Sequence, residues 1–304
     1  MLTLEDKAGV LMESLGNKVK ESDKFINRFI LRAKGFVWYA CFQYGHFNFK
    51  NSGEIDTRFA EDFSYFVFTK STKSLISIRL LLHNNNMEDA LILLRTVFEG
   101  YMASRFIVEN DTPRLIRDFV FIPQFISKKE IIFNGETAKL RNGELIDYEQ
   151  MKPSKMKLGK DKGYFYDFYE FLCNYAHCNF SIISCYLDER ESFTVDKVVN
   201  AYVVRILVIF VYTKLFEQIV TVEGEDFLDE RTEKECYLLV KEATLFLDMN
   251  LDFLGKCDYA QYDIALMEHM KKMFTSMRKS LREEVGSLHK DFLPNLENKK
   301  PLKT

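Results

Sequence analysis

The sequence predicts an all-α protein, a multi-helix bundle of about eight helices with an irregular insertion near residues 127–162. Three observations support this class. Only 5 prolines and 13 glycines occur in 304 residues, which disfavours a turn-rich β protein. Apolar residues recur with helical spacing along most of the chain. The 28 phenylalanines and 15 tyrosines are expected to fill space between helices rather than to stack on nucleic-acid bases.

The N-terminal part of the chain is predicted to form long helices joined by polar turns. The first helical region is expected to extend from about residue 3 to residue 48, with a break near Ser22 and Asp23. A second helix is expected over residues 56–83, and the polar turn 84–86 leads directly into the next helix. Because so short a link joins antiparallel neighbours, these two helices are predicted to form an αα-hairpin.

Residues 127–162 interrupt the helical pattern. A helix that begins at Pro113 is broken at Pro123, and the periodicity then fades. We expect a long excursion or lid here, with a short hairpin within residues 131–146. The lysines at its end could reach RNA or another anion, but acids surround them, so a solvated loop is the expectation. These lysines are Lys152, Lys155, Lys157, Lys160 and Lys162, and the acids are Glu144, Asp147, Glu149 and Asp161.

Helices are predicted again in the second half of the chain. Their expected ranges are 164–187, 194–222, 231–251 and 258–284, with Gly286 as the terminating residue of the last. Residues 1–285 are interpreted as a single helical domain, with a family-like core at about 60–220 and a helical C-terminal extension at about 229–285. Residues 286–304 are expected to form a flexible tail.

Composition and charge indicate a cytoplasmic protein without a membrane partner. The net charge of −3 gives no overall attraction to nucleic acid or anionic lipid. The most apolar run, residues 201–220, contains Arg205 and Lys214, which are too costly inside a bilayer, so a buried helix is expected. The chain does not open with a basic stretch followed by an apolar one, as a secretion signal would. The six cysteines lack a disulfide-framework spacing and are expected to be reduced thiols.

Several families of enzymes are disfavoured by missing motifs. The sequence has no phosphate-binding GxxxxGK[ST] loop, no GxGxxG dinucleotide motif, no HExxH and no GxSxG. Cys173 and His177 lie four residues apart and share a helix face, but no second such pair completes a zinc site. We therefore expect no metal and no cofactor.

Arg95 and Glu99 are the first candidate site residues. They lie one helical turn apart in a segment that is otherwise apolar nearly all round, and charges rarely enter a core unless they are paired. In a functional site, Arg95 would hold an anionic group such as a phosphate and Glu99 would orient it or act as a base. The alternative is a structural ion pair that fixes this helix to a neighbour.

His177 is the third candidate. It is one of only five histidines and follows an aromatic-rich amphipathic run, with the polar side chains of Asn174, Tyr175 and Asn179 nearby. A histidine there could act as a general acid or base near neutral pH. The alternative is a helix-packing histidine bonded to a neighbouring carbonyl or acid.

Two sequence patterns resemble an uncharacterised family of all-helical bacterial proteins, a domain of unknown function. One is Leu-Leu-Arg-x-x-x-Glu on the helix after the asparagine turn, and the other is Tyr-x-x-Leu-x-x-Tyr-x-His. The resemblance implies that Arg95, Glu99 and His177 belong to one constellation across helices, and the family brings no established activity. The matching residues are Leu91, Leu94, Arg95, Glu99, Tyr169, Leu172, Tyr175 and His177.

An arginine, an acid and a histidine on a helical bundle are also similar to the HEPN ribonucleases of bacterial defence and toxin systems. Those enzymes cut RNA without a metal, using an arginine followed a few residues later by a histidine. No arginine precedes His177 at that spacing, whereas Arg282 and His289 have it. The likeness is one of residue types.

These observations leave two main hypotheses. In the first, the protein is a cytoplasmic effector, of defence or toxin type, that acts on RNA or another phosphate-bearing substrate: Arg95 binds the anion, His177 transfers protons and Glu99 positions one of them. In the second, it is a non-catalytic scaffold or adaptor that pairs with itself or with a partner protein, and the same residues form a structural polar network. A small-molecule pocket lined by aromatic residues is a third option.

Overall fold

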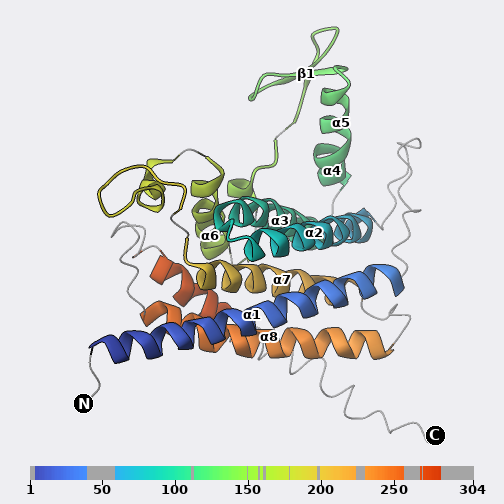
Figure 1. Cartoon of the computed structure of the whole chain (residues 1–304). Helices are drawn as coiled ribbons and strands as arrows, with labels where there is room; N and C mark the ends of the chain where they lie inside the picture. The colour runs from blue at the N-terminus through green and yellow to red at the C-terminus, as the bar shows by residue number, and fades with distance from the viewer. Residues whose placement is uncertain are drawn as a thin grey trace, which may run out of the picture.

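The structure, a computed structural model, confirms the predicted all-α class (Figure 1). It describes residues 4–39, 59–110, 113–148, 150–156, 158–159, 162–177, 179–196, 199–223, 230–256, 268 and 270–281. The long helices are α1 (Leu4–Tyr39), α2 (Phe59–His83), α3 (Met87–Glu109), α6 (Lys162–Ala176), α7 (Ala201–Glu223) and α8 (Glu230–Lys256), and residues 270–281 are helical as well.

Helices α2 and α3 form the predicted hairpin. The turn between them closes with a hydrogen bond from the Asn86 backbone N–H to the Leu81 carbonyl oxygen, 2.9 Å long. Asn85 adopts the left-handed conformation at φ 59°, which asparagine tolerates better than most residues. Further along, the two helices approach closely at Gly100, where a Cβ would lie 3.4 Å from a Val67 methyl group.

Helix α7 is the centre of the core. Its side chains are buried on all faces from Tyr202 to Phe216, so the predicted buried helix is confirmed. In Figure 1, α7 lies between a layer containing α2, α3 and α6 and a layer containing α1 and α8. Arg205, only 4% exposed, donates from Nε to Asp23 on α1 at 2.8 Å and from Nη2 to the Leu82 carbonyl oxygen at 3.2 Å. This buried arginine joins three elements.

The predicted break in the first helix near Ser22 and Asp23 is wrong. Helix α1 continues through both residues because the Ser22 hydroxyl donates to the Lys18 carbonyl oxygen at 2.8 Å, while Asp23 pairs with Arg205. The predicted C-terminal end of this helix, near residue 48, lies outside the described residues.

Two other helix boundaries also differ from prediction. The helix expected over residues 164–187 ends at Ala176, and a 3-10 helix, Phe180–Tyr186, follows it. The Asn179 side chain accepts the Ser181 backbone N–H at 3.0 Å and starts this tighter helix. The helix expected from residue 194 begins at Ala201, because the Asn200 side chain caps it by accepting the backbone N–H groups of the second and third helical residues.

Residues 113–148 form an arm that projects from the bundle (Figure 1). It begins with α4 (Pro113–Ile116), a π-helical turn (Arg117–Phe121) and α5 (Ile122–Ser127), and continues with β1 (Ile131–Phe133), β2 (Ala138–Leu140) and β3 (Leu145–Ile146). The strands pair antiparallel in the order β1-β2-β3, so the predicted hairpin is confirmed and gains a third strand. Ile122, Ile131 and Ala138 form a small core that belongs to the arm alone.

No described helix is long and apolar enough to cross a membrane. Of the lysines that end the insertion, Lys152 and Lys155 are exposed, in keeping with a solvated loop. The helical segment expected over residues 258–284 is present where it is described, at residues 270–281. The expected tail, Arg282 and His289 lie outside the described residues, and the assignment of residues 1–285 to one domain stays a prediction.

Candidate functional site

Arg95 extends from α3 onto α6, where two side chains hold its guanidinium group. Its Nη2 atom donates to the Tyr169 hydroxyl at 2.7 Å, and its Nε atom donates to the Cys173 sulfur at 3.1 Å. The guanidinium carbon also lies 5.1 Å from the centre of the Tyr169 ring, within the range of a cation–π contact. Because Tyr169 and Cys173 are spaced i, i+4 on α6, they present adjacent groups to the same arginine.

Glu99 completes this group of residues. Its Oε2 atom lies 3.6 Å from Nη2 of Arg95, which is the i, i+4 pair that the spacing predicts. The two side chains are 23% and 39% exposed, so this pair is reached by solvent and is not sealed in the core. We call Arg95, Glu99, Tyr169 and Cys173 the Arg95 cluster.

Contacts within the Arg95 cluster and burial set the pKa values of Tyr169 and Arg95. Burial raises the pKa of Tyr169 to about 12; the hydrogen bond from Arg95 works in the opposite direction, and the one with Cys173 adds to the rise. Burial lowers the pKa of Arg95, but its hydrogen bonds to Cys173 and Tyr169 outweigh that effect and leave the pKa raised. Arg95 therefore stays cationic and Tyr169 stays neutral at physiological pH.

His177 lies at the C-terminal end of α6, one helical turn beyond Cys173. Its backbone N–H donates to the Cys173 carbonyl oxygen at 3.2 Å, so the last turn of the helix is closed there. The imidazole is exposed, and among the described residues it has no hydrogen bond to Arg95 or Glu99. His177 is thus adjacent to the sulfur that Arg95 contacts, without being part of the same hydrogen-bond network.

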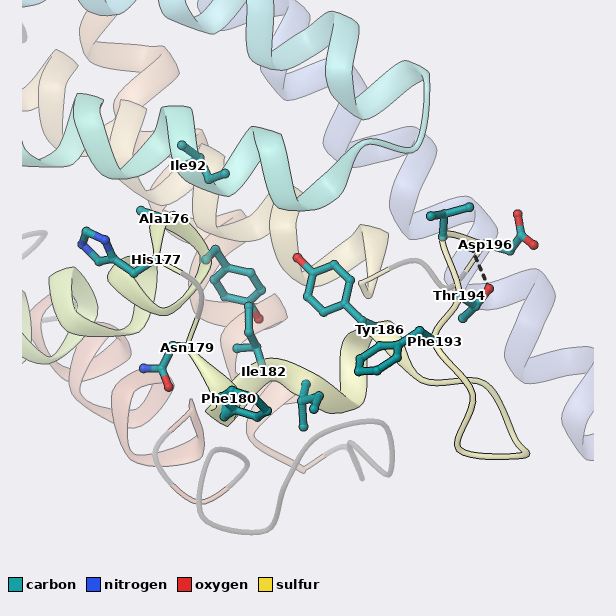
Figure 2. Close-up of a pocket in the computed structure, with 13 residues that line it drawn as sticks. Ile92, Ala176, His177, Asn179, Phe180, Ile182, Tyr186, Phe193, Thr194 and Asp196 are labelled. Carbon is teal, nitrogen blue, oxygen red and sulfur yellow. Dashed lines mark hydrogen bonds between the residues drawn. The ribbon is translucent and has the colours of Figure 1, made fainter.

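An open groove of about 930 Å³ adjoins the Arg95 cluster. Ile92, one turn before Arg95 on α3, lies on one side of the groove, and side chains from residues 179–186 and 193–196 lie on the other (Figure 2). His177 lies at one end of the groove and Thr194 and Asp196 lie at the other (Figure 2). The floor and walls are apolar, with Phe180, Ile182, Tyr186 and Phe193 among them.

The polar residues expected around His177 are found there. Asn179 donates from Nδ2 to the Asn174 side-chain oxygen at 2.7 Å, and Tyr175 lines the groove. Tyr169 and Cys173 were not expected as partners of Arg95. The sequence marks Tyr169 as part of the family-like pattern and Cys173 as a neighbour of His177, but it does not predict their contact with Arg95, which the packing of α3 against α6 produces.

The comparisons with known proteins assign part of the chain. Residues 61–194 match DUF5677, a family of unknown function. The DUF5677 match confirms the resemblance to an uncharacterised family, and it contains the whole Arg95 cluster and His177. It also contains the groove as far as Thr194, so that only Val195 and Asp196 fall beyond it. No curated protein and no solved structure matches the chain.

The described residues contain no group of three or more histidine, cysteine, aspartate or glutamate side chains placed to hold a metal ion. The Arg95 cluster itself offers one carboxylate and one thiol, and an arginine stands between them. Within the DUF5677 segment, the chemistry available at this place is that of a fixed cation, a carboxylate, a neutral phenol and an exposed imidazole.

Proposed function

We propose that the Arg95 cluster binds a phosphate group of RNA or of another phosphate-bearing substrate, and that His177 transfers protons there. The observation that carries the proposal is the state of the Arg95 guanidinium. Two of its nitrogens are held by Tyr169, Cys173 and Glu99, while Nη1 makes no hydrogen bond within the part of the chain that the structure describes. A pre-oriented and solvent-reached guanidinium edge is suited to an anion.

The orientation of Arg95 supports binding of the anion in a defined position. Arginine loses conformational entropy when it is fixed, and here the contacts with α6 have already fixed it before a ligand arrives. Its charge would stabilise the negative charge that develops on phosphate oxygens during transfer. Glu99, beside Nη2, would position a hydroxyl group or a water molecule by accepting a hydrogen bond from it.

His177 supplies the mobile proton in this proposal. Histidine is the side chain best suited to give and take protons near neutral pH, and His177 is exposed at the end of the groove one turn from Cys173. The chemistry uses these side chains alone. In a cell, such a protein would be a cytoplasmic effector of defence or toxin type, the class to which the likeness with HEPN ribonucleases points.

The test compares variants of the site with matched variants elsewhere. Labelled single-stranded RNA is incubated with the full chain, and its products are separated on a gel. We expect His177→Ala to slow cleavage by about 10²–10⁴-fold and Arg95→Ala by about 10²–10³-fold. His83→Ala, an exposed histidine at the end of α2, should keep the rate.

A second control comes from the same helix. Arg105 and Glu109 also form an i, i+4 pair on α3, with exposed fractions close to those of Arg95 and Glu99. Arg105→Ala should therefore leave RNA cleavage unchanged while removing a comparable surface pair. Unchanged RNA degradation by His177→Ala would refute the proposed chemistry, as would equal losses in Arg95→Ala and Arg105→Ala.

The second candidate function is that of a helical adaptor. It is favoured by the groove, whose aromatic side chains are open to solvent and have no role in phosphate chemistry. In that case, the Arg95 cluster is a structural network that joins α3 to α6. All the variants above should then still bind the partner protein of the adaptor.

A further inference from the structure

The groove beside His177 exposes large apolar side chains to an unusual degree. Phe180 is 81% exposed, Phe193 is 80% exposed and Val195 is 96% exposed, and all three line the groove. Single exposed apolar residues are common on protein surfaces, but a group that lines one hollow marks an interaction site. The high exposure also means that these side chains do not enclose a small molecule, which ordinarily needs most of its surface covered.

Carboxylates lie at one end of this apolar floor, with Asp196 in its lining and three more on the neighbouring turn. In the sequence, residues 174–197 contain four carboxylates and two cationic residues, Arg190 and Lys197. The carboxylates are Asp188, Glu189, Glu191 and Asp196, and all four are exposed. Asp188 accepts the backbone N–H groups of Arg190 and Ser192 at 2.8 and 2.9 Å, which fixes the tight turn that carries three of these acids beside Tyr186 and Phe193.

We propose that this groove docks a basic amphipathic helix of a partner protein. The apolar face of such a helix, with side chains at i, i+3, i+4 and i+7, would cover Phe180, Phe193 and Val195. Lysine or arginine residues at its borders would meet the acidic turn and Asp196. Charge complementarity of this kind steers association and selects partners. The same carboxylates repel a polyanion, so RNA is disfavoured at the end of the groove that carries Thr194 and Asp196, opposite His177. This inference does not depend on the chemistry at Arg95.

The test uses two synthetic peptides as probes. One is a fluorescein-labelled leucine/lysine peptide whose leucines are spaced for one face of a helix, and the other replaces every lysine by glutamate. Each is titrated with the full chain, and binding is followed by fluorescence anisotropy. We expect saturable binding of the leucine/lysine peptide and at least about tenfold weaker binding of the leucine/glutamate peptide, since the rim charges then repel it.

A groove variant shows whether binding takes place at this site. Phe180→Ser together with Phe193→Ser should weaken binding of the leucine/lysine peptide at least about tenfold. The reason is that the peptide then buries two fewer apolar side chains when it binds. The matched control is Ile132→Ser with Leu145→Ser, two exposed apolar residues on the arm, and it should bind as the unchanged chain does. All four positions are largely exposed, so the variants should fold, as a circular dichroism melt would verify.

A rim variant tests the charge complementarity. Glu189→Lys with Asp196→Lys should weaken binding several-fold at low ionic strength and flatten its dependence on salt. Glu136→Lys with Glu144→Lys, which makes the same change of charge on the exposed turns of the arm, is the control.

Three outcomes would overturn the inference. They are equal binding of the two peptides, binding that survives the groove variant, and binding of a labelled oligouridine that the groove variant abolishes. The last would assign the groove to nucleic acid. Because the docking test uses no cleavage readout, its failure leaves the proposal for Arg95 and His177 standing, and the reverse also holds.

Discussion

At the scale of single residues, two arginines show how the surroundings decide a role. Arg205 is almost fully buried, and its donors reach Asp23 and the backbone oxygens of Leu82 and Ala201. Among the residues that the structure describes, Arg95 has side-chain partners only, and it remains accessible to solvent. A buried charge with backbone partners serves the fold, whereas an accessible one with a free edge can serve a ligand.

These surroundings predict different losses of stability. Arg205→Ala should reduce the free energy of unfolding by about 3–5 kcal/mol, because it removes the buried partner of Asp23, which keeps only the longer contact with Arg79, and two hydrogen bonds to backbone oxygens. Arg95→Ala should cost only about 1–2 kcal/mol, the scale of a half-exposed pair with its hydrogen bonds. Urea unfolding followed by circular dichroism measures both. A loss at Arg95 as large as that at Arg205 would mean that the Arg95 cluster is chiefly structural.

Tyr169 predicts a dependence of stability on pH. Its pKa is raised from 10.0 to about 12 in the folded protein, so folding favours the neutral phenol. The associated stabilisation is fully present below pH 10 and is lost as the pH rises towards 12. Unfolding free energies measured over this range should therefore fall more steeply for the natural chain than for Tyr169→Phe. Parallel curves would contradict the raised pKa. Buried Tyr212, whose pKa is also raised, contributes equally to both proteins.

The sequence predicts this site only in part. Arg95 and Glu99 were predictable as a pair because their contact is local and depends on helical spacing alone. The exposure of these two side chains to solvent was not predictable, because an apolar segment indicates a buried helix without showing which of its faces is accessible. The contacts with Tyr169 and Cys173 join residues more than 70 positions apart, and no local pattern encodes them.

At the scale of elements, hydrogen bonds of polar side chains decide where helices end. The break expected near Ser22 does not occur because its hydroxyl bonds back to the helix and Asp23 has a distant partner in Arg205. Asn179 and Asn200, by contrast, bond to backbone N–H groups ahead of them and begin new elements. The same residue types thus continue or interrupt a helix according to their partners, which explains why elements were predicted better than their boundaries.

The turn between α2 and α3 provides a test at this scale. Asn85→Ile should cost about 1–2 kcal/mol of stability, since a β-branched residue fits the left-handed conformation poorly. Asn85→Gly should be close to neutral, because glycine adopts this conformation without strain. Thermal melts of both variants check the prediction, with Asn84→Ala as a control in the same turn. Equal melting temperatures for the isoleucine and glycine variants would argue against a fixed left-handed residue there.

At the scale of the whole molecule, the outer part of the arm, residues 122–148, and the bundle have separate cores, whereas Leu115 at the base of the arm belongs to the core of the bundle. The arm packs around Ile122, Ile131 and Ala138, and ring contacts such as that of Phe119 with Phe63 on α2 link its base to the bundle. The bundle packs around α7, with α1, α2, α3, α6 and α8 contributing to one continuous cluster. This arrangement predicts that the outer part of the arm can unfold without the bundle.

Two substitutions at buried positions test this independence. Ile131→Asp should open the arm to limited proteolysis while the main thermal transition of the bundle is retained. Leu207→Asp, on α7, should abolish that transition, because it places a carboxylate at the centre of the main core. If Ile131→Asp also removes the main transition, the two cores unfold as one.

Helix α7 lies outside the segment that matches the family, and this affects which part of the chain can fold. The segment shared with DUF5677 ends at residue 194, whereas α7 begins at Ala201. Helices α2 and α3 therefore turn apolar faces towards a partner that lies beyond the shared segment. A fragment cut at the family boundary would bare those faces to water and aggregate. The matched segment is therefore shorter than the unit that we expect to fold by itself.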